Sequence, residues 1–155
     1  MNIPIVAGIM LMLFGVYLLL GAINNYKKAS ASLTWPSVKG KLRKVELWGT
    51  RNVDGDMKAS ERLDVTYEYD VSGHEYAGNT VAFYTLMYPE TTDFANKFAV
   101  DSEVDVYYNP DKPDEAVLVT GLREDRKRYS DVILSGAAVG VGFIIAVSGW
   151  AGFIG

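Results

Sequence analysis

Few side chains in this sequence could carry out chemistry, and they are widely scattered. His74 is the single histidine, and the 155 residues include no cysteine. A metal site or a catalytic triad needs several such groups close together, and no compact carboxylate cluster accompanies His74. Beside the Ser72-Gly73 turn, His74 is interpreted as a solvated strand residue. The absence of cysteine excludes disulfide bonds, thiolate metal sites and a thiol nucleophile.

Three acidic residues, Asp54, Asp56 and Glu61, are close enough in sequence to suggest calcium ligands. Their spacing departs from that of the EF-hand loop, and the third oxygen ligand of that loop is missing. The sequence also lacks a phosphate-binding glycine loop, a nucleophile elbow and an HExxH motif. We therefore expect no catalytic residue, no metal site and no cofactor, and we predict that the protein is not an enzyme.

Aromatic residues suggest a different chemistry, the stacking of nucleic-acid bases on a sheet surface. Such surfaces also need basic grooves, whereas this chain has 15 basic and 19 acidic side chains and a net charge of −4. Tyr67, Tyr69, Tyr76 and Tyr108 also fall on the predicted core side of their strands. Nucleic acid is therefore not an expected partner.

Two stretches without charged residues, Ile3 to Ile23 and Val132 to Ile154, enclose the polar part of the chain and must position it. As helices they span roughly 32 to 35 Å, enough for a hydrocarbon core of about 30 Å. They are apolar on every face, and a chain of this size cannot bury two such helices in a soluble core. The predicted domains are transmembrane helix 1 (1–23), a soluble β-rich domain (24–131) and transmembrane helix 2 (132–155).

The first stretch is interpreted as a retained helix and not as a removable signal peptide. No basic residue precedes it, and Ala29-Ser30-Ala31 only imitates a cleavage site behind Lys27 and Lys28. The helix is expected to continue beyond the membrane as far as Trp35-Pro36, because the residue before a proline is pushed out of the helical region.

The segment between the stretches has the two-residue period of an antiparallel sheet. In its clearest strand, 63–71, apolar and tyrosine residues alternate with polar ones. The Ser72-Gly73 turn then returns the chain over 74–81, which places Tyr76 opposite Tyr69.

The first strand is less regular than this one. It is predicted to begin at Val38, with an irregularity at Gly40. A long polar connection is expected over 49–61, with a hairpin tip at Asp54-Gly55.

The remaining segments complete a small α+β domain. A short helix is predicted to begin near Pro89, with Phe94 and Phe98 covering the sheet. Further strands are expected over 103–108 and 116–120, separated by a stiff turn. The fold class is a membrane protein with two transmembrane helices flanking a small antiparallel β-rich domain of about five strands and one short helix.

Three motifs carry a resemblance to known sequences: W-P-x-V-x-G at 35–40, Y-x-Y-x-V-x-G-x-x-Y at 67–76, and V-x-V-Y-Y-N-P-x-x-P-x-x-A-x-L at 104–118. Through them the chain resembles a family of small bacterial membrane proteins catalogued as a domain of unknown function. The resemblance implies a β-rich domain next to or between membrane helices, and no activity. The chain departs from the family pattern at Asp101-Ser102, where a glycine usually precedes the strand.

The motif residues are interpreted as sheet core or turn residues. They are Trp35, Pro36, Gly40, Tyr67, Tyr69, Gly73, Tyr76, Tyr107, Tyr108, Asn109, Pro110 and Pro113. A second set should allow close helix packing in the membrane, with Gly8 and Gly15 in the first helix and Gly136 and Gly140 in the second. Its nearest partner would be the other helix of the same chain, and a second copy or a foreign subunit is the alternative.

Two function classes remain open. The first is a membrane-anchored interaction or accessory module whose β domain docks a partner protein. The second is an oligomeric membrane component that acts on lipid or solute through its helices. The first is favoured, because neither stretch holds the charged residues or helix breaks that transport sites use. The expected partners are membrane lipids and either another protein or further copies of the chain.

Positive charge near the two stretches predicts their orientation. The flanking basic residues all lie on the side of the soluble segment, at Lys27, Lys28, Lys39, Lys41, Arg123, Arg126, Lys127 and Arg128. Because basic flanks stay in the cytoplasm, the soluble domain is predicted to be cytoplasmic, in a multi-pass protein of the bacterial inner membrane.

This orientation predicts the labelling of introduced cysteines. On intact cells, an impermeant thiol reagent should react with a cysteine placed near Gly155 and not with one at Ser60, because only the former lies outside. Labelling at position 60 alone would reverse the orientation.

Overall fold

The computed structural model describes residues 3–123 and 130–151 and divides the chain into two compact units. One unit, made of 1–27 and 123–155, holds two long helices. The other, Lys28–Leu122, holds a five-stranded sheet. The flanking residues Arg126, Lys127 and Arg128 lie outside the described residues.

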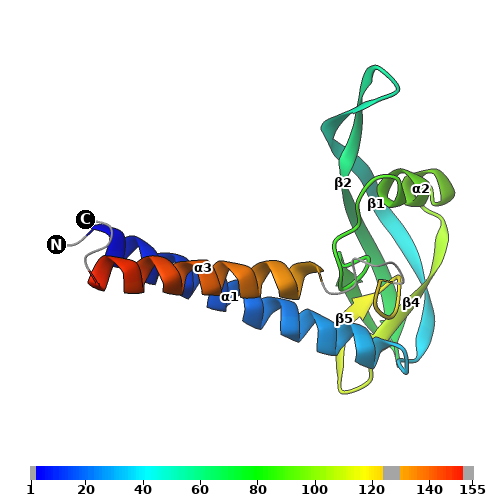
Figure 1. The fold of residues 1–155 in the computed structure, drawn as a ribbon. Helices are drawn as coiled ribbons and strands as arrows, with labels where there is room; N and C mark the ends of the chain where they lie inside the picture. The colour runs from blue at the N-terminus through cyan, green and yellow to red at the C-terminus, as the bar shows by residue number, and fades with distance from the viewer. Residues whose placement is uncertain (1–2, 124–129, 152–155) are drawn as a thin grey trace. The chain divides into compact units, whose positions relative to one another are not determined.

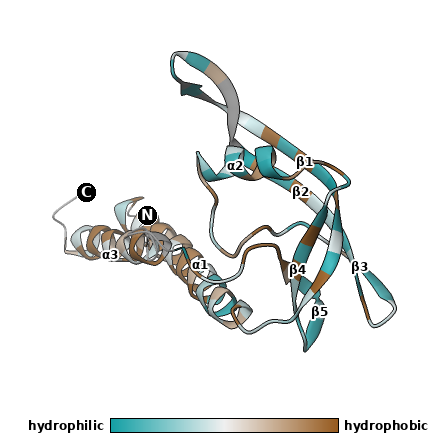
Figure 2. Ribbon diagram, turned by 90° about the vertical axis from the view of Figure 1, so that its right-hand side faces the viewer, coloured by the Kyte–Doolittle hydropathy of each residue, from teal (hydrophilic) through white to brown (hydrophobic). Residues whose placement is uncertain are grey.

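The long helices are α1 (Ile3–Ser32) and α3 (Ser130–Trp150). Both are long and apolar enough to cross a membrane, and Figure 2 shows hydrophobic residues along their length. α1 ends just before Trp35-Pro36, which confirms the expected stop.

Glycines line the contact between α1 and α3. A Cβ added at Gly8 would lie 2.5 Å from the backbone N of Ala146, and one at Gly15 would lie 2.8 Å from that of Val139. On α3 the glycines at the contact are Gly142 and Gly149. The pair on each helix is seven residues apart, which keeps both glycines on one face across two turns and lets the backbones approach closely.

The expectation that Gly136 and Gly140 face the first helix is wrong. A Cβ at either position would meet no atom within 4 Å among the described residues. At about 100° per residue, Gly140 lies roughly 160° around α3 from Gly142. The seven-residue spacing on α3, and not the four-residue spacing, forms the contact.

The sheet is wholly antiparallel and confirms the predicted architecture of five strands and one short helix between two apolar helices (Figure 1). Its order is β3-β2-β1-β4-β5, so β1 is central. The elements are β1 (Ser37–Val53), β2 (Asp56–Val71), β3 (His74–Gly78), α2 (Glu90–Lys97), β4 (Glu103–Asn109) and β5 (Lys112–Val117).

β1 and β2 form a long hairpin where a polar connection was expected over 49–61, so that expectation is wrong. The strands stay paired up to Asp54-Gly55, and this predicted tip is confirmed. Both tip residues have positive φ, 55° and 92°, as a two-residue type I′ turn requires. Polar side chains did not prevent pairing, because the ladder is made by backbone groups.

The irregularity in β1 lies at Arg43 and not at Gly40. The register shifts between Leu42 and Lys44, so Arg43 is the extra residue of a bulge. Gly40 is instead required by close packing, since a Cβ there would lie 2.6 Å from Cγ2 of Val106.

Two further strands differ from their expected bounds, and the first of them, β3, ends at Gly78 where a strand over 74–81 was expected. Tyr69 pairs with Tyr76 across β2 and β3, and α2 begins directly after Pro89. β5 begins at Lys112, earlier than the expected 116–120, because Pro110-Asp111 forms a two-residue turn. Pro113 therefore lies within β5, and an edge strand tolerates proline.

Two tyrosines on β2 reach across the interior of the curled sheet to β5. The Tyr67 hydroxyl lies 2.8 Å from the Thr80 carbonyl oxygen and 2.9 Å from that of Ala116. The Tyr69 hydroxyl donates to the Pro113 carbonyl at 2.6 Å. Burial raises the pKa of both phenols, that of Tyr69 to about 12, so both remain protonated donors at neutral pH.

Gly78 makes room for the Tyr67 ring, which generates a stability prediction. A Cβ at Gly78 would lie 2.5 Å from Cε2 and Cζ of that ring. Gly78→Ala should therefore destabilise the domain by about 1–3 kcal/mol, measured by thermal unfolding of the full chain in detergent. Ala77→Ser, at the exposed neighbour, should change stability by less than about 0.5 kcal/mol. Equal effects would contradict the packing described.

Candidate functional site

The residues first considered for chemistry do not assemble into a reactive centre. In the described ranges, no three His, Asp or Glu side chains lie close enough to hold a metal ion. Asp54 and Asp56 are exposed at the hairpin tip, and the side chain of Glu61 lies outside the part described. His74 is exposed beside its turn, as expected. The surfaces of the sheet unit are therefore the remaining candidates.

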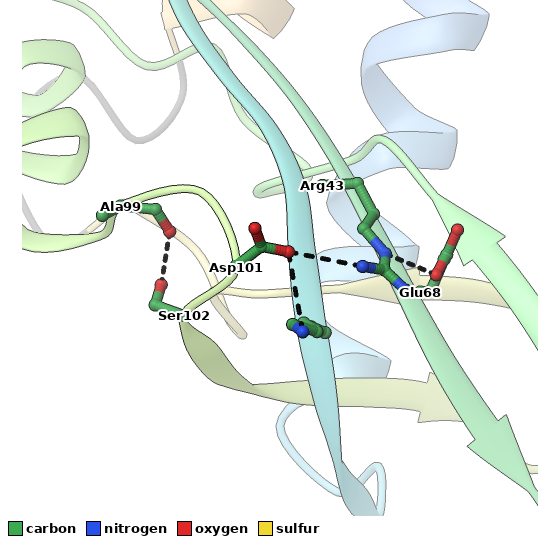
Figure 3. A network of polar contacts seen from close by, with 6 residues as sticks. Arg43, Glu68, Ala99, Asp101 and Ser102 are labelled. Atoms are coloured by element: carbon green, nitrogen blue, oxygen red, sulfur yellow. Dashed lines mark hydrogen bonds and ion pairs between the residues drawn. The ribbon is translucent and has the colours of Figure 1, made fainter.

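The outer face of the sheet carries a ladder of ion pairs. Central β1 supplies basic residues, and its neighbours β2 and β4 supply acidic ones. Arg43 Nε donates to Glu68 at 2.6 Å (Figure 3). On the other side of β1, Lys39 Nζ lies 2.9 Å from Asp105. These pairs are exposed and individually weak.

Asp101 fixes the turn that joins α2 to β4. Its φ of 67° is left-handed, a conformation that glycine adopts most readily. Its N–H donates to the Leu42 carbonyl at 2.7 Å, and its carboxylate lies 3.3 Å from Arg43 and 3.6 Å from Lys41 (Figure 3). The turn, and with it the end of α2, is thereby held against β1.

A groove beside α2 is lined from both faces of β4, with buried Val104 on one face and exposed Glu103 and Asp105 on the other. The cavity is about 490 Å³. Its apolar lining comes from α2, β4 and the segments flanking the helix and β5, and consists of Leu86, Phe94, Phe98, Val104, Leu118 and Val119. The Phe94 and Phe98 rings are 4.8 Å apart and pack together, although α2 ends at Lys97 and Phe98 is the extended residue that caps it.

The rim of the groove is charged and predominantly acidic. The charged lining residues are Lys39, Glu90, Asp93, Lys97, Glu103 and Asp105. Lys39 is shared between Glu103 and Asp105, and the Lys97 ammonium lies 5.1 Å from the centre of the Phe98 ring. Four carboxylates therefore face two ammonium groups, and the rim has a net charge of −2.

The last turn of α1 belongs to the sheet unit and is bound to it by polar contacts. Buried Ser32 donates from its hydroxyl to the Ala29 carbonyl at 2.7 Å and accepts from the Gly121 N–H at 2.9 Å. Lys28 forms an ion pair with Glu115, which also accepts from Asn109 at 3.0 Å. Burial acts to raise the pKa of the Glu115 carboxyl, but the hydrogen bonds from Lys28 and Asn109 outweigh it and lower that pKa.

The predicted motif residues lie mostly in core and turns, and not at one site. Trp35 packs edge-on against Phe83 at 5.7 Å, and Tyr76 stacks on Tyr69 at 5.7 Å. Of the third motif, Val104, Tyr107 and Leu118 line the groove. Sequence reasoning did not identify Leu86 or Leu118 as binding residues, and the spacing of Phe94 and Phe98 was the one available signal for this site.

Comparison with known proteins gives a family and nothing beyond it. The model of DUF3592, a domain of unknown function, matches residues 38–123, which is more than half of the chain. The matched range contains α2 and all five strands apart from the first residue of β1. Neither a curated protein nor a solved structure matches significantly.

The Lys28–Glu115 pair predicts a pH dependence of stability. Because the pKa of Glu115 is lowered on folding, its contribution is present above its unfolded pKa of about 4.3 and is lost as pH falls through the folded pKa. Glu115→Gln should cost roughly 0.5–1 kcal/mol at pH 7, and this difference should shrink as pH falls below about 4.3. Thermal unfolding of both proteins across this range checks it, and a constant difference would contradict the assignment.

Proposed function

Since the chain belongs to the DUF3592 family, whose function is unknown, we propose from its structure that it is a membrane-anchored interaction module whose β domain docks a partner protein. The observation that carries the proposal is the groove beside α2. It combines an apolar lining with a charged rim, which is the arrangement at which partner proteins bury anchor residues.

Anchoring in a membrane is supported by the surface of the two helices. Large apolar side chains are exposed on both, for example Leu13 at 65% and Phe143 at 58%. Apolar surface of this extent is rare on a soluble protein, and a bilayer would cover it. The positive flanks favour the bacterial inner membrane with the β domain in the cytoplasm.

A role in docking agrees better with the domain than a role in catalysis. Tyr67 and Tyr69, the tyrosines with raised pKa, are used to join strands and lie in the core. The lining of the groove brings six apolar side chains together beside charged ones, as a surface for binding another protein does. These features favour binding of a partner at the groove.

The second candidate is an oligomeric membrane component that acts on lipid or solute through its helices. One observation favours it: a Cβ added at Gly136 or Gly140 would meet no atom within 4 Å among the described residues. Glycines four residues apart let another helix approach closely. The proposed docking role is preferred, because the helices carry no charged residue between Ile3 and Tyr26 or between Val132 and Trp150.

Copurification with matched variants tests the docking role. The full chain, extracted from native membranes in mild detergent, should retain a second protein in a fixed ratio. Leu118→Glu places a carboxylate in the apolar lining. It should weaken the affinity for that protein at least about tenfold, which corresponds to about 1.4 kcal/mol of binding free energy.

Met57→Glu is the control, since it adds the same charge to an exposed hairpin residue and should retain the partner. A homo-oligomer without other protein would favour the second candidate. A partner lost equally from both variants would contradict docking at the groove.

A further inference from the structure

We infer that the groove beside α2 recognises a peptide segment in which an apolar anchor is flanked by lysine or arginine residues. The inference rests on the proposed docking function and specifies the chemistry of the partner. It follows from the volume and lining of the groove, the sign of its rim and the charge of the whole sheet unit.

The apolar lining of the groove determines which side chain of the peptide can serve as its anchor. At about 490 Å³ the cavity falls in the range of roughly 300–1,000 Å³ in which proteins hold ligand groups. Phe94 and Val104 are buried at its base, while Phe98, Leu86 and Leu118 are half-buried and so can still lose solvent contact. An aliphatic or aromatic side chain gains burial there, whereas a polar one would be desolvated without a partner.

The charges of the groove rim determine which residues can flank the anchor of the bound peptide. Of the two basic residues, Lys39 is already shared by two carboxylates, and Lys97 lies beside the Phe98 ring. Asp93 is exposed on the helix at the edge of the groove. A cation beside the anchor would be attracted by this excess of carboxylates, and an anion would be repelled.

The charge of the whole unit excludes several other occupants. Lys28–Leu122 contains ten basic and sixteen acidic residues, so its net charge is −6. Nucleic acid and anionic lipid headgroups are repelled by such a surface, and so is the sheet unit of a second copy. A basic segment of another protein remains the complementary partner.

Selection from a random octapeptide library tests the inference. The full chain, held in phosphatidylcholine nanodiscs, is the target, and empty nanodiscs remove membrane-binding peptides. Enriched peptides should contain an aliphatic or aromatic residue flanked by Lys or Arg. At low ionic strength, Asp93→Lys should weaken the best peptide about fivefold, while the matched Glu75→Lys on exposed β3 should leave its affinity unchanged. Replacing the anchor of that peptide with serine should abolish binding.

The outcomes separate this inference from the proposed function. Enriched peptides without basic flanks, or peptides weakened equally by Asp93→Lys and Glu75→Lys, would overturn the groove's specificity and leave docking intact. No enrichment over empty nanodiscs would overturn both.

Discussion

The sheet unit depends on hydrogen bonds that cross its interior from β2 to β5. These strands are separated in the sheet by β1 and β4, so only a curled sheet brings them together. The hydroxyls of Tyr67 and Tyr69 reach the carbonyls of Ala116 and Pro113, which ties the sheet across its open side. Because the phenols are buried, a lost bond would leave a polar group unsatisfied and would cost more than the bond itself contributes.

The groove follows from this curl and from one turn. Curling brings Leu118 and Val119, which follow β5, to the side of the sheet that α2 covers, and they join the groove lining there. Asp101 then holds the turn from α2 to β4 against β1, and Phe98, which precedes this turn, lines the cavity. A short helix over a strongly curled sheet thus leaves an apolar gap, and the charges of β4 and α2 give that gap an acidic rim.

Much of the fold could be predicted from the sequence because its signals are local. The alternation over 63–71, the Ser72-Gly73 turn and the proline before α2 each specify structure within a few residues. The hairpin arm over 49–61 was missed because its side chains are polar while its pairing is a backbone property. The irregularity was predicted at Gly40 and lies at Arg43, because a change in which residues face the core does not say which residue of the strand is the extra one.

The groove and the helix contact were harder to foresee because both depend on distant residues. Gly142 and Gly149 pack on α1, yet the four-residue spacing of Gly136 and Gly140 is the more familiar signal. Leu86 and Leu118 are distant in sequence and meet only when the sheet curls. Nothing local marks either as part of a binding surface.

Amide hydrogen exchange of the double variant Tyr67→Phe/Tyr69→Phe tests the central claim most directly. The account predicts that amides of β5 and of 79–81 exchange at least about tenfold faster than in the unaltered chain, because about 1.4 kcal/mol of local stability is lost. Amides of β1 paired with β2 should keep their protection. Unchanged protection in β5 would contradict the account, because the tyrosine hydroxyls would then not hold the sheet in its curled form.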